Sequence, residues 1–467
     1  MVETFQRRID AKLILSVAAC GLMSFSGVVV ETAMNVTFPS LMSEFNVSTG
    51  LVQWVTTGYL LVLTAIMPLS SLLKRRFRTK TLFLAAIFLF IAGTLCCGAA
   101  SAFWMLVLGR VIQGVGTGLA LPLMFNIVVE QTPFERMGTM TAVATLVTAL
   151  APAVGPSVGG YIVTTWGWRT IFWALMPLLL ASLAAGVYAI RQVSETQPVK
   201  FSAAQFVALA GGFSCLVFAA SAASTAGWLS AQVLGLLAAA IILLAAFCVA
   251  SKRSDSPLIR IDIFRERRFV LCLMYAVLLQ AVVLGLGYLL PYYGQEVCEQ
   301  NAFDAGCLLL PGCIVGAVLT PLGGRILDAL GARRPLTLGS LFLLAAMVLY
   351  ACLALGSAPW VLMAIYILVP ICQGLSSANS MTCGLRFLPE DLKTDGNASF
   401  TTLQQLGGAL GTAVCTSIVN ASQASSASDL VAGTMTGTSI SLYVLLVLSA
   451  AGVLCILGVF AGKKAQQ

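Results

Sequence analysis

Two charged side chains stand out because they lie deep within long apolar stretches of the sequence, Glu31 and Arg110. A charge near the centre of a bilayer costs about 2.5–3.5 kcal/mol on insertion scales, so such residues usually serve a function. Burial disfavours the ionised form of a carboxyl group, whereas a nearby arginine favours it. We therefore expect Glu31 to bind a proton or a cationic substrate, with Arg110 adjusting its charge state. The alternative is a structural Glu–Arg pair that joins two helices.

Each of these charges has a polar neighbour at helical spacing. Asn35 lies four residues after Glu31, and Gln113 lies three residues after Arg110. Residues three or four apart share one face of a helix. The spacing therefore predicts two polar helix faces, each with one charge and one amide.

Residue types that most enzymes and metal sites require are missing. The sequence has no histidine, no paired cysteines at zinc-binding spacing and no G-x-x-x-x-G-K-[ST] nucleotide motif. We therefore expect no enzyme activity, no cofactor and no metal. Because no ATP-binding motif is present, any transport by this chain would be driven by an electrochemical gradient. Most of the 14 cysteines lie in apolar runs, where cysteine behaves as a small hydrophobic residue. Cys298 and Cys307 flank a predicted loop, which leaves a disulfide between them open.

Composition places the helices that carry these residues in a membrane. Hydrophobic residues make up 59% of the 467 residues and charged residues 9%, whereas a soluble domain carries about 25% charged residues. A helix crosses the bilayer core with about 20 apolar residues. The net charge of +8 comes from short basic loops and does not indicate nucleic-acid binding.

The hydropathy pattern predicts an all-α polytopic membrane protein with fourteen transmembrane helices. If both termini are cytoplasmic, nearly all Lys and Arg residues fall in inner loops, and Arg169 is the exception on the outer side. This asymmetry supports the count with both termini cytoplasmic, and we expect the protein in the plasma membrane. The predicted spans are 13–37, 51–73, 80–100, 104–129, 137–163, 169–190, 203–224, 229–250, 269–293, 305–327, 335–355, 360–386, 398–420 and 439–461.

Two stretches of the chain repeat each other at a distance that exceeds half its length. The segment from Ser70 to Lys80 resembles the segment from Gly324 to Arg334. An offset of this size implies material inserted between the repeats. It predicts a six-helix half at 1–190, two inserted helices with linkers at 191–265, and a second six-helix half at 266–467. Parallel repeats of this kind occur in transporters.

The second of these loops carries a recognisable motif. It resembles the G-x-L-x-D-R-x-G-R-R motif of the major facilitator superfamily at Gly324, Asp328, Gly331 and Arg333. In the first loop Arg75 and Arg78 are kept, but Lys74 stands where the family has Asp. The resemblance implies that this loop acts as a latch that steadies one conformation, and the lysine puts the first latch in doubt.

Two further segments resemble the fourteen-helix drug:proton antiporters of this superfamily. Arg110-x-x-Gln113-Gly114 is similar to the membrane-embedded arginine motif that the family uses in proton coupling. A second segment is similar to the motif that marks antiporters, at Pro152, Gly155, Pro156, Gly159 and Gly160. The first helix matches the family pattern at Asn35, but Glu31 lies one residue after the usual acid.

The resemblance also implies a central cavity for a small-molecule substrate. Aromatic and amide groups around one acid suit a lipophilic cation, although Trp54 and Tyr292 are equally explained as residues of the membrane interface. The candidate lining residues are Gln53, Trp54, Tyr59, Gln280, Tyr288, Tyr292, Gln373 and Ser377.

The function implied is proton-coupled efflux of drugs or other small lipophilic, cationic compounds by alternating access. The partners expected are the substrate, protons and membrane lipid, with the chain acting as a monomer. Uptake or facilitated diffusion of one specific solute is the alternative, and the antiporter motif argues against it.

Overall fold

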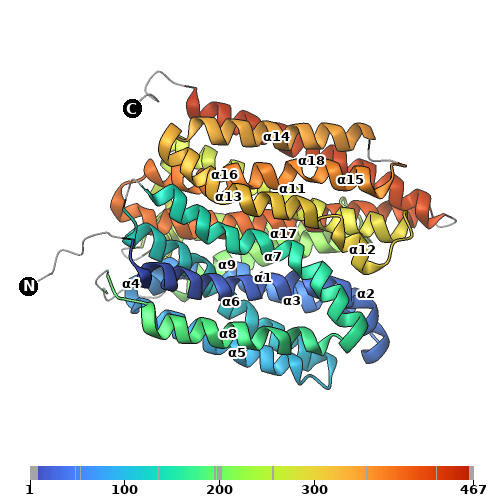
Figure 1. Ribbon diagram of the computed structural model, residues 1–467, viewed down its shortest axis with the longest axis horizontal. Helices are drawn as coiled ribbons and strands as arrows, with labels where there is room; N and C mark the ends of the chain where they lie inside the picture. Colours follow the sequence, from blue (N-terminus) through green and yellow to red (C-terminus); the bar gives the residue numbers. More distant parts are fainter. Residues whose placement is uncertain are drawn as a thin grey trace, which may run out of the picture. The chain divides into compact units, whose positions relative to one another are not determined.

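The computed structural model describes residues 9–47, 49–52, 54–133, 136–193, 196, 202–254, 257–353, 356–426 and 429–461. Within these ranges the chain is helical and contains no strand (Figure 1). It divides into two compact units, Met1–Phe201 and Ser202–Gln467. The all-α class predicted from the sequence is therefore confirmed.

The first unit contains α1 (Ala11–Phe45), α2 (Thr49–Val52), α3 (Trp54–Ile66), α4 (Leu69–Arg76), α5 (Thr79–Gly98), α6 (Phe103–Gln131), α7 (Met137–Trp166) and α8 (Arg169–Ala189). The second contains α9 (Ala203–Ala226), α10 (Ala231–Lys252), η2 (Ile261–Arg265), α11 (Arg267–Glu296), α12 (Ala302–Cys307), α13 (Leu310–Leu330), α14 (Arg333–Leu353), α15 (Pro359–Tyr366), α16 (Leu368–Arg386), η3 (Glu390–Leu392), α17 (Lys393–Ser425) and α18 (Leu430–Phe460).

Eleven helical segments of the described chain are long and apolar enough to cross a bilayer. Large apolar side chains are exposed along them, such as Ile241 on α10 and Leu454 on α18, each 69% exposed. A water-soluble protein would not expose so much apolar surface, whereas lipid covers it without cost. The chain is therefore a multi-pass membrane protein.

Three predicted spans lie outside these eleven segments. The span 51–73 is divided between the short apolar helix α3 and α4, with Met67 and Pro68 in a turn between them. Proline lacks the backbone N–H that a continuous helix requires, which favours a break here. The spans 137–163 and 398–420 lie in α7 and α17, which are each continuous helices.

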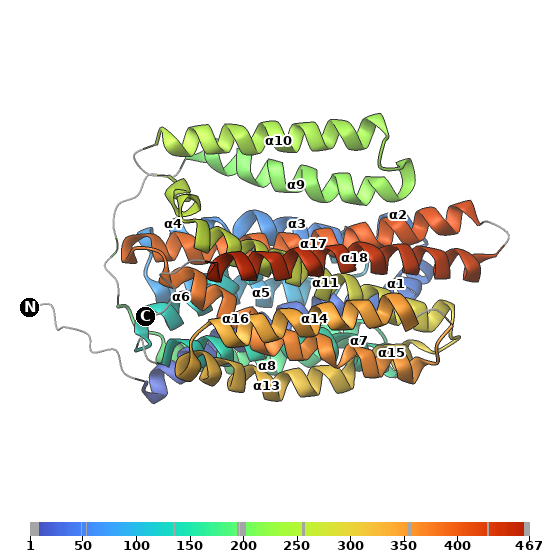
Figure 2. The ribbon, with the colours of Figure 1, turned by 90° about the horizontal axis from the view of Figure 1, so that it is seen from above.

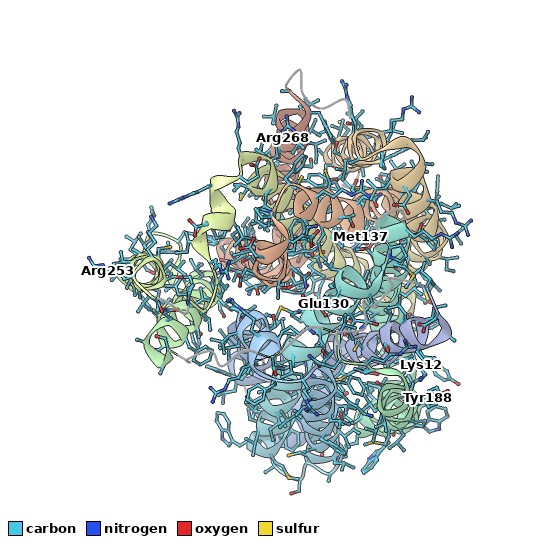
Figure 3. All side chains as sticks on the ribbon, turned by 90° about the vertical axis from the view of Figure 1, so that its left-hand side faces the viewer. Lys12, Glu130, Met137, Tyr188, Arg253 and Arg268 are labelled. Atoms are coloured by element: carbon cyan, nitrogen blue, oxygen red, sulfur yellow. The ribbon has the colours of Figure 1, made fainter. Side chains whose placement is uncertain are left out.

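Helix α1 is the centre of the first unit and packs against α6, α7 and α8. Its start is held by Asp10, whose side chain accepts a hydrogen bond from Leu13 N at 2.8 Å and pairs with Arg191. Lys12 lies over the ring of Tyr188 on α8, as Figure 3 shows. Helix α6 also packs on α3 and α5, so it links these two helices to α1.

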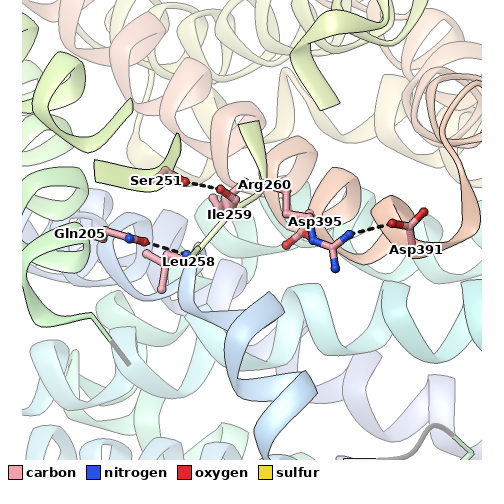
Figure 4. A network of polar contacts seen from close by, with 7 residues as sticks. All are labelled: Gln205, Ser251, Leu258, Ile259, Arg260, Asp391 and Asp395. Atoms are coloured by element: carbon pink, nitrogen blue, oxygen red, sulfur yellow. Dashed lines mark hydrogen bonds and ion pairs between the residues drawn. The ribbon is translucent and has the colours of Figure 1, made fainter. Parts of the chain in front are cut away.

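The second unit is built around α11, which packs on α16, α17 and α18. The helices α9 and α10 lie side by side (Figure 2), and α9 also packs on α17. Polar contacts secure the chain that follows α10 (Figure 4): Leu258 N donates to Gln205 Oε1 at 2.8 Å, and Arg260 pairs with Asp391 at 2.7 Å. The two helices predicted as an insertion thus pack within the second unit.

Candidate functional site

Arg110 is fully buried in the first unit and is held there by neutral groups. Its Nε donates to the backbone oxygen of Val55 at 3.1 Å, and its Nη1 donates to Gln113 Oε1 at 2.8 Å. The guanidinium lies 4.1 Å from the centre of the Tyr59 ring, a cation–π contact. No carboxylate of the described residues forms an ion pair with Arg110, and its Nη2 has no hydrogen-bond partner.

Gln113 continues the network from Arg110 into α5. Its Nε2 donates to Thr94 Oγ1 at 2.9 Å, and the Thr94 hydroxyl in turn donates to the backbone oxygen of Phe90 at 2.8 Å. Both side chains are buried, so the network is shielded from water and its bonds are strengthened. Arg110 and Gln113, which the helical spacing placed on one face, are joined by a hydrogen bond in the structure.

Glycines of α6 allow α3 and α5 to approach closely enough for these contacts. A Cβ atom on Gly114 would lie 2.8 Å from the Tyr59 backbone oxygen on α3. A Cβ on Gly116 would lie 2.8 Å from the Ala86 oxygen on α5. The small residues after Arg110 therefore place its partners from both neighbouring helices.

Glu31 lies on α1, is 6% exposed, and has a buried Oε2 without a hydrogen-bond partner. Arg110 is near enough to interact electrostatically with this carboxyl group, and Tyr59 interacts electrostatically with both charges. Among the described residues no ion pair joins Glu31 to any cation. The structure thus places one acid and one arginine in the interior of the first unit without an ion pair between them. The side chain of Asn35, the predicted neighbour of Glu31, lies outside the described residues.

The predicted antiporter motif on α7 packs directly against the part of α1 that carries Glu31. A Cβ on Gly155 would overlap Thr32 Oγ1, and a Cβ on Gly159 would lie 2.6 Å from the Cβ of Ala33. Thr32 and Ala33 follow Glu31 in the chain. Pro156 and Gly160 are buried on the same helix, and the side chain of Pro152 is outside the described residues.

The other cavity candidates of the first unit differ in their surroundings. Tyr59 is fully buried beneath Arg110, as described above. Trp54 begins α3 and packs on a cluster of buried apolar residues that includes Val55 and Leu106. Gln53 lies outside the described residues.

In the second unit the candidate residues form neutral polar contacts. Tyr288 and Tyr292 stack with ring centres 5.4 Å apart, and the Tyr292 hydroxyl accepts from Gln423 Nε2 at 2.9 Å. Ser377 Oγ accepts from Gln404 Nε2 at 3.4 Å. Gln280 and Gln373 are half-buried on α11 and α16.

The predicted latch residues of the second unit lie in the last two turns of α13 and at the start of α14. Gly331 ends α13 with a positive φ of 76°, which glycine adopts without strain, and Arg333 begins α14. Asp328 lies 3.9 Å from Arg386, and Gly324 is buried on the same helix as Asp328. In the first unit Arg75 is half-buried and Arg78 is exposed. The cysteines Cys298 and Cys307 are free thiols, so the conceivable disulfide is not formed.

Several residues of these networks had no distinctive sequence signal. Thr94 is an ordinary threonine in an apolar helix, and its role follows only from its contact with Gln113. Glu44 binds both Trp168 Nε1 at 2.7 Å and Arg169 Nη2 at 2.6 Å. In the sequence, Arg169 stood out only as the basic residue on the predicted outer side.

A family model decides the relationship of this chain. Residues 20–412 match the model of the Major Facilitator Superfamily. The chain belongs to this superfamily. It is a membrane transporter and not an enzyme.

Curated members of the superfamily match most of the chain. Lincomycin resistance protein LmrB of Listeria monocytogenes is 34% identical over 87% of this chain and 86% of its own length. LmrB of Bacillus subtilis is 33% identical over 86% and 84%. The multidrug resistance protein B homolog of Mycobacterium tuberculosis is 26% identical over 88% and 77%.

A solved transporter structure shares the fold. The human organic anion transporter MFSD10 (TETRAN) superposes with a TM-score of 0.68, covering 95% of this chain and 100% of that chain. At 12% sequence identity this likeness concerns the fold alone. Together the relatives place this chain among superfamily transporters whose members include drug resistance proteins.

Proposed function

We propose that this chain exports drugs or other small lipophilic, cationic compounds in exchange for protons, by alternating access. The observation that carries the proposal is the buried Glu31 carboxyl, which has an unpartnered oxygen near a buried arginine that is itself bound only by neutral groups. Ion-pair locks that serve only stability satisfy both partners, and these two groups leave hydrogen-bonding capacity open.

The chemistry follows from the cost of leaving a buried carboxylate unpaired. Burying a neutral carboxylic acid away from water costs far less free energy than burying an isolated carboxylate. Glu31 is therefore protonated in this state. Loss of that proton creates a negative charge that a cationic substrate can neutralise. Proton and substrate therefore compete for one carboxyl group, which couples their movement in opposite directions. Arg110 limits how much negative charge the interior gains.

We place the chain in the fourteen-helix family of drug:proton antiporters, in the plasma membrane, with both termini cytoplasmic and the monomer as the working form. Supporting this, α7 and α17 are long enough to cross the membrane, and α3 with α4 covers the remaining span. The helix starts Thr79 and Arg333 are separated by nearly the same length of chain as the starts Met137 and Lys393. These matching offsets support two six-helix halves, at 1–190 and 266–467, with two inserted helices at 191–265.

The substrate class is supported by the printed names of the relatives and by the site. Two relatives are named for resistance to lincomycin and one for multidrug resistance. The Tyr288–Tyr292 stack and the neutral amides of the second unit offer aromatic and hydrogen-bonding surface without a competing charge. Such groups bind lipophilic molecules of varied shape.

The export assay uses cells that lack their own exporters and express the full chain. We expect lower accumulation of ethidium or lincomycin than in cells with the empty vector, and we expect a protonophore to abolish the difference. An Arg110→Gln variant, present in the membrane at wild-type amount, should not lower accumulation. Export that persists with the protonophore would rule out coupling to the proton gradient, and net uptake would favour the solute importer.

A further inference from the structure

Lys74, which replaces the acid expected in the first latch loop, has an ionic partner in the structure. The side chain is 3% exposed, and its Nζ lies 2.9 Å from Glu130 Oε2, near the end of α6. Figure 3 labels Glu130 at the end of the first unit that faces the viewer. A buried ammonium group is costly unless it is paired and hydrogen-bonded, and this contact supplies the pairing.

The same ammonium group also reaches the beginning of α5. Nζ donates to Thr79 Oγ1 at 2.7 Å, and the backbone N–H of Thr79 donates to Gln192 Oε1 at 2.7 Å, just after α8. One lysine on α4 therefore holds the end of α6 and the start of α5, and through Thr79 the segment after α8.

The second unit has an ion pair of opposite polarity at the corresponding place. Asp328 on α13 lies 3.9 Å from Arg386, the last residue of α16. Asp328 follows Lys74 by the same offset that separates the helix starts Thr79 and Arg333. Arg386 likewise follows Glu130 by the offset that separates the starts of α7 and α17. In the first unit the base lies on α4 and the acid on α6, whereas in the second unit the acid lies on α13 and the base on α16.

We infer that Lys74 and Glu130 form the latch of the first unit, with the two charges exchanged relative to Asp328 and Arg386. Coulomb attraction depends on the product of the charges, so an exchange of both preserves the attraction while either change alone turns it into repulsion. The substitution of the usual acid by Lys74 is thus compensated by Glu130 in the same unit. Both residues act by positioning α4, α5 and α6, and the role in the transport cycle rests on the proposed function.

The test compares Lys74→Glu, Glu130→Lys and the double variant in the purified full chain and in cells. Each single variant should lower the unfolding temperature, speed deuterium uptake in residues 70–80 and lower ethidium export roughly fivefold or more. The double variant restores opposite charges at the same two positions and should recover all three quantities to within about twofold of wild type. It also leaves the loop charge balance that orients the protein unchanged.

Arg76→Glu is the matched control because it reverses a charge on the same helix at an exposed position. It should leave the unfolding temperature and the deuterium uptake near wild type. Lys74→Gln provides a milder variant in case Lys74→Glu does not fold, and it should fall between wild type and the charge reversal. A double variant no better than the worse single variant would overturn the inference, as would a Lys74→Gln protein that melts and exchanges like wild type.

The readouts separate this inference from the proposed function. If wild type exports no ethidium, the proposed function fails for this compound, while recovery of melting and deuterium uptake in the double variant still supports the paired latch. If export is present and the double variant recovers melting but not export, the pair is structural only and its role in the cycle is overturned.

Discussion

Arg110 shows how a full charge can be kept inside a membrane protein without an acid beside it. Two hydrogen bonds, to the Val55 backbone and to Gln113, and the Tyr59 ring take the place of water. Hydrogen bonds that involve a charged group contribute about 1.5–3 kcal/mol each, and a desolvated cation–π contact about 2 kcal/mol or more. The stability of the buried Arg110 charge thus depends on these neutral neighbours.

The Tyr59 ring is the most easily tested of these neighbours. Tyr59→Phe keeps the ring beneath Arg110, so we expect nearly normal export and stability. Tyr59→Leu removes the ring and should destabilise the protein by about 2 kcal/mol or more and reduce export. Unfolding temperature and ethidium export of the two purified variants measure the difference. Equal behaviour of the Phe and Leu variants would show that the cation–π contact contributes nothing.

Glu44 is an ionisable group outside the apolar part of α1, and its pH dependence can be predicted. The hydrogen bond from Arg169, followed in importance by that from Trp168, holds the pKa of the Glu44 carboxyl below its ordinary value of 4.5, although partial burial opposes this shift. A carboxyl with a lowered folded-state pKa stabilises the protein above its unfolded-state pKa. That contribution is lost as the pH falls through the folded-state pKa.

Glu44→Gln should therefore lower the unfolding temperature at pH 7 and lower it less at pH 3, where protonation of the carboxyl in wild type weakens the contribution. Both partners are more than a third exposed, so the expected effect is at most about 1 kcal/mol. Melting curves of wild type and variant at the two pH values test this, with Glu296→Gln, at a half-buried position on α11, as the control. A deficit of the same size at both pH values would contradict the assignment to the ionised carboxylate.

At the scale of elements, α7 packs against the part of α1 that carries Glu31. Gly155 and Gly159 are four residues apart and both face α1, at Thr32 and Ala33. Small residues at this spacing let two helix backbones approach closely. The position of Glu31 in the interior is therefore determined in part by a helix that contributes no charge to the site.

Gly159→Val should push α1 away from α7 and impair export more than it impairs folding. A Cβ at this glycine would lie 2.6 Å from the Ala33 Cβ and would also meet the Ala33 backbone, and such overpacking costs about 1–3 kcal/mol. Val158→Leu adds volume on the exposed face of the same turn and should be neutral. Export per folded molecule, with the amount of folded protein measured by size-exclusion chromatography, tests the prediction. Normal export by Gly159→Val would mean that the close approach is unnecessary.

Helix positions were predictable from the sequence because apolar runs of about 20 residues are a strong signal. The ends were less so: α1 continues to Phe45 and α18 begins at Leu430, beyond the predicted spans. These extensions contain polar residues such as Glu44, so hydropathy alone does not include them. The break between α3 and α4 was also missed, since the apolar run continues through Pro68.

The charged members of the site were predictable for a related reason, and their partners were not. Glu31 and Arg110 contrast with their apolar surroundings, whereas the contact of Gln113 with Thr94 depends on how α6 packs on α5. The Lys74–Glu130 pair joins α4 to the end of α6, with the whole of α5 between them in the chain. Sequence spacing carries no information on contacts between such distant positions.

At the scale of the whole molecule, the two units differ in where they carry charge. The first unit holds Glu31 and Arg110 within α1 and α6, whereas the buried charges of the second unit, Lys393 and Asp395, lie in the first turn of α17 and pair with Glu390 and Arg260. This asymmetry leads us to assign proton exchange to the first unit and neutral substrate contacts to the second. The central claim is therefore that Glu31 carries the exchanged proton.

Proton flux in proteoliposomes tests that claim most directly. The purified full chain is reconstituted with a pH-sensitive dye inside, a range of lipophilic cations including ethidium is added, and wild type is compared with Glu31→Gln and Glu31→Asp. We predict substrate-dependent proton movement in wild type, reduced movement in Glu31→Asp and none in Glu31→Gln, with both variants folded as judged by size-exclusion chromatography. Undiminished proton movement in Glu31→Gln would contradict the account.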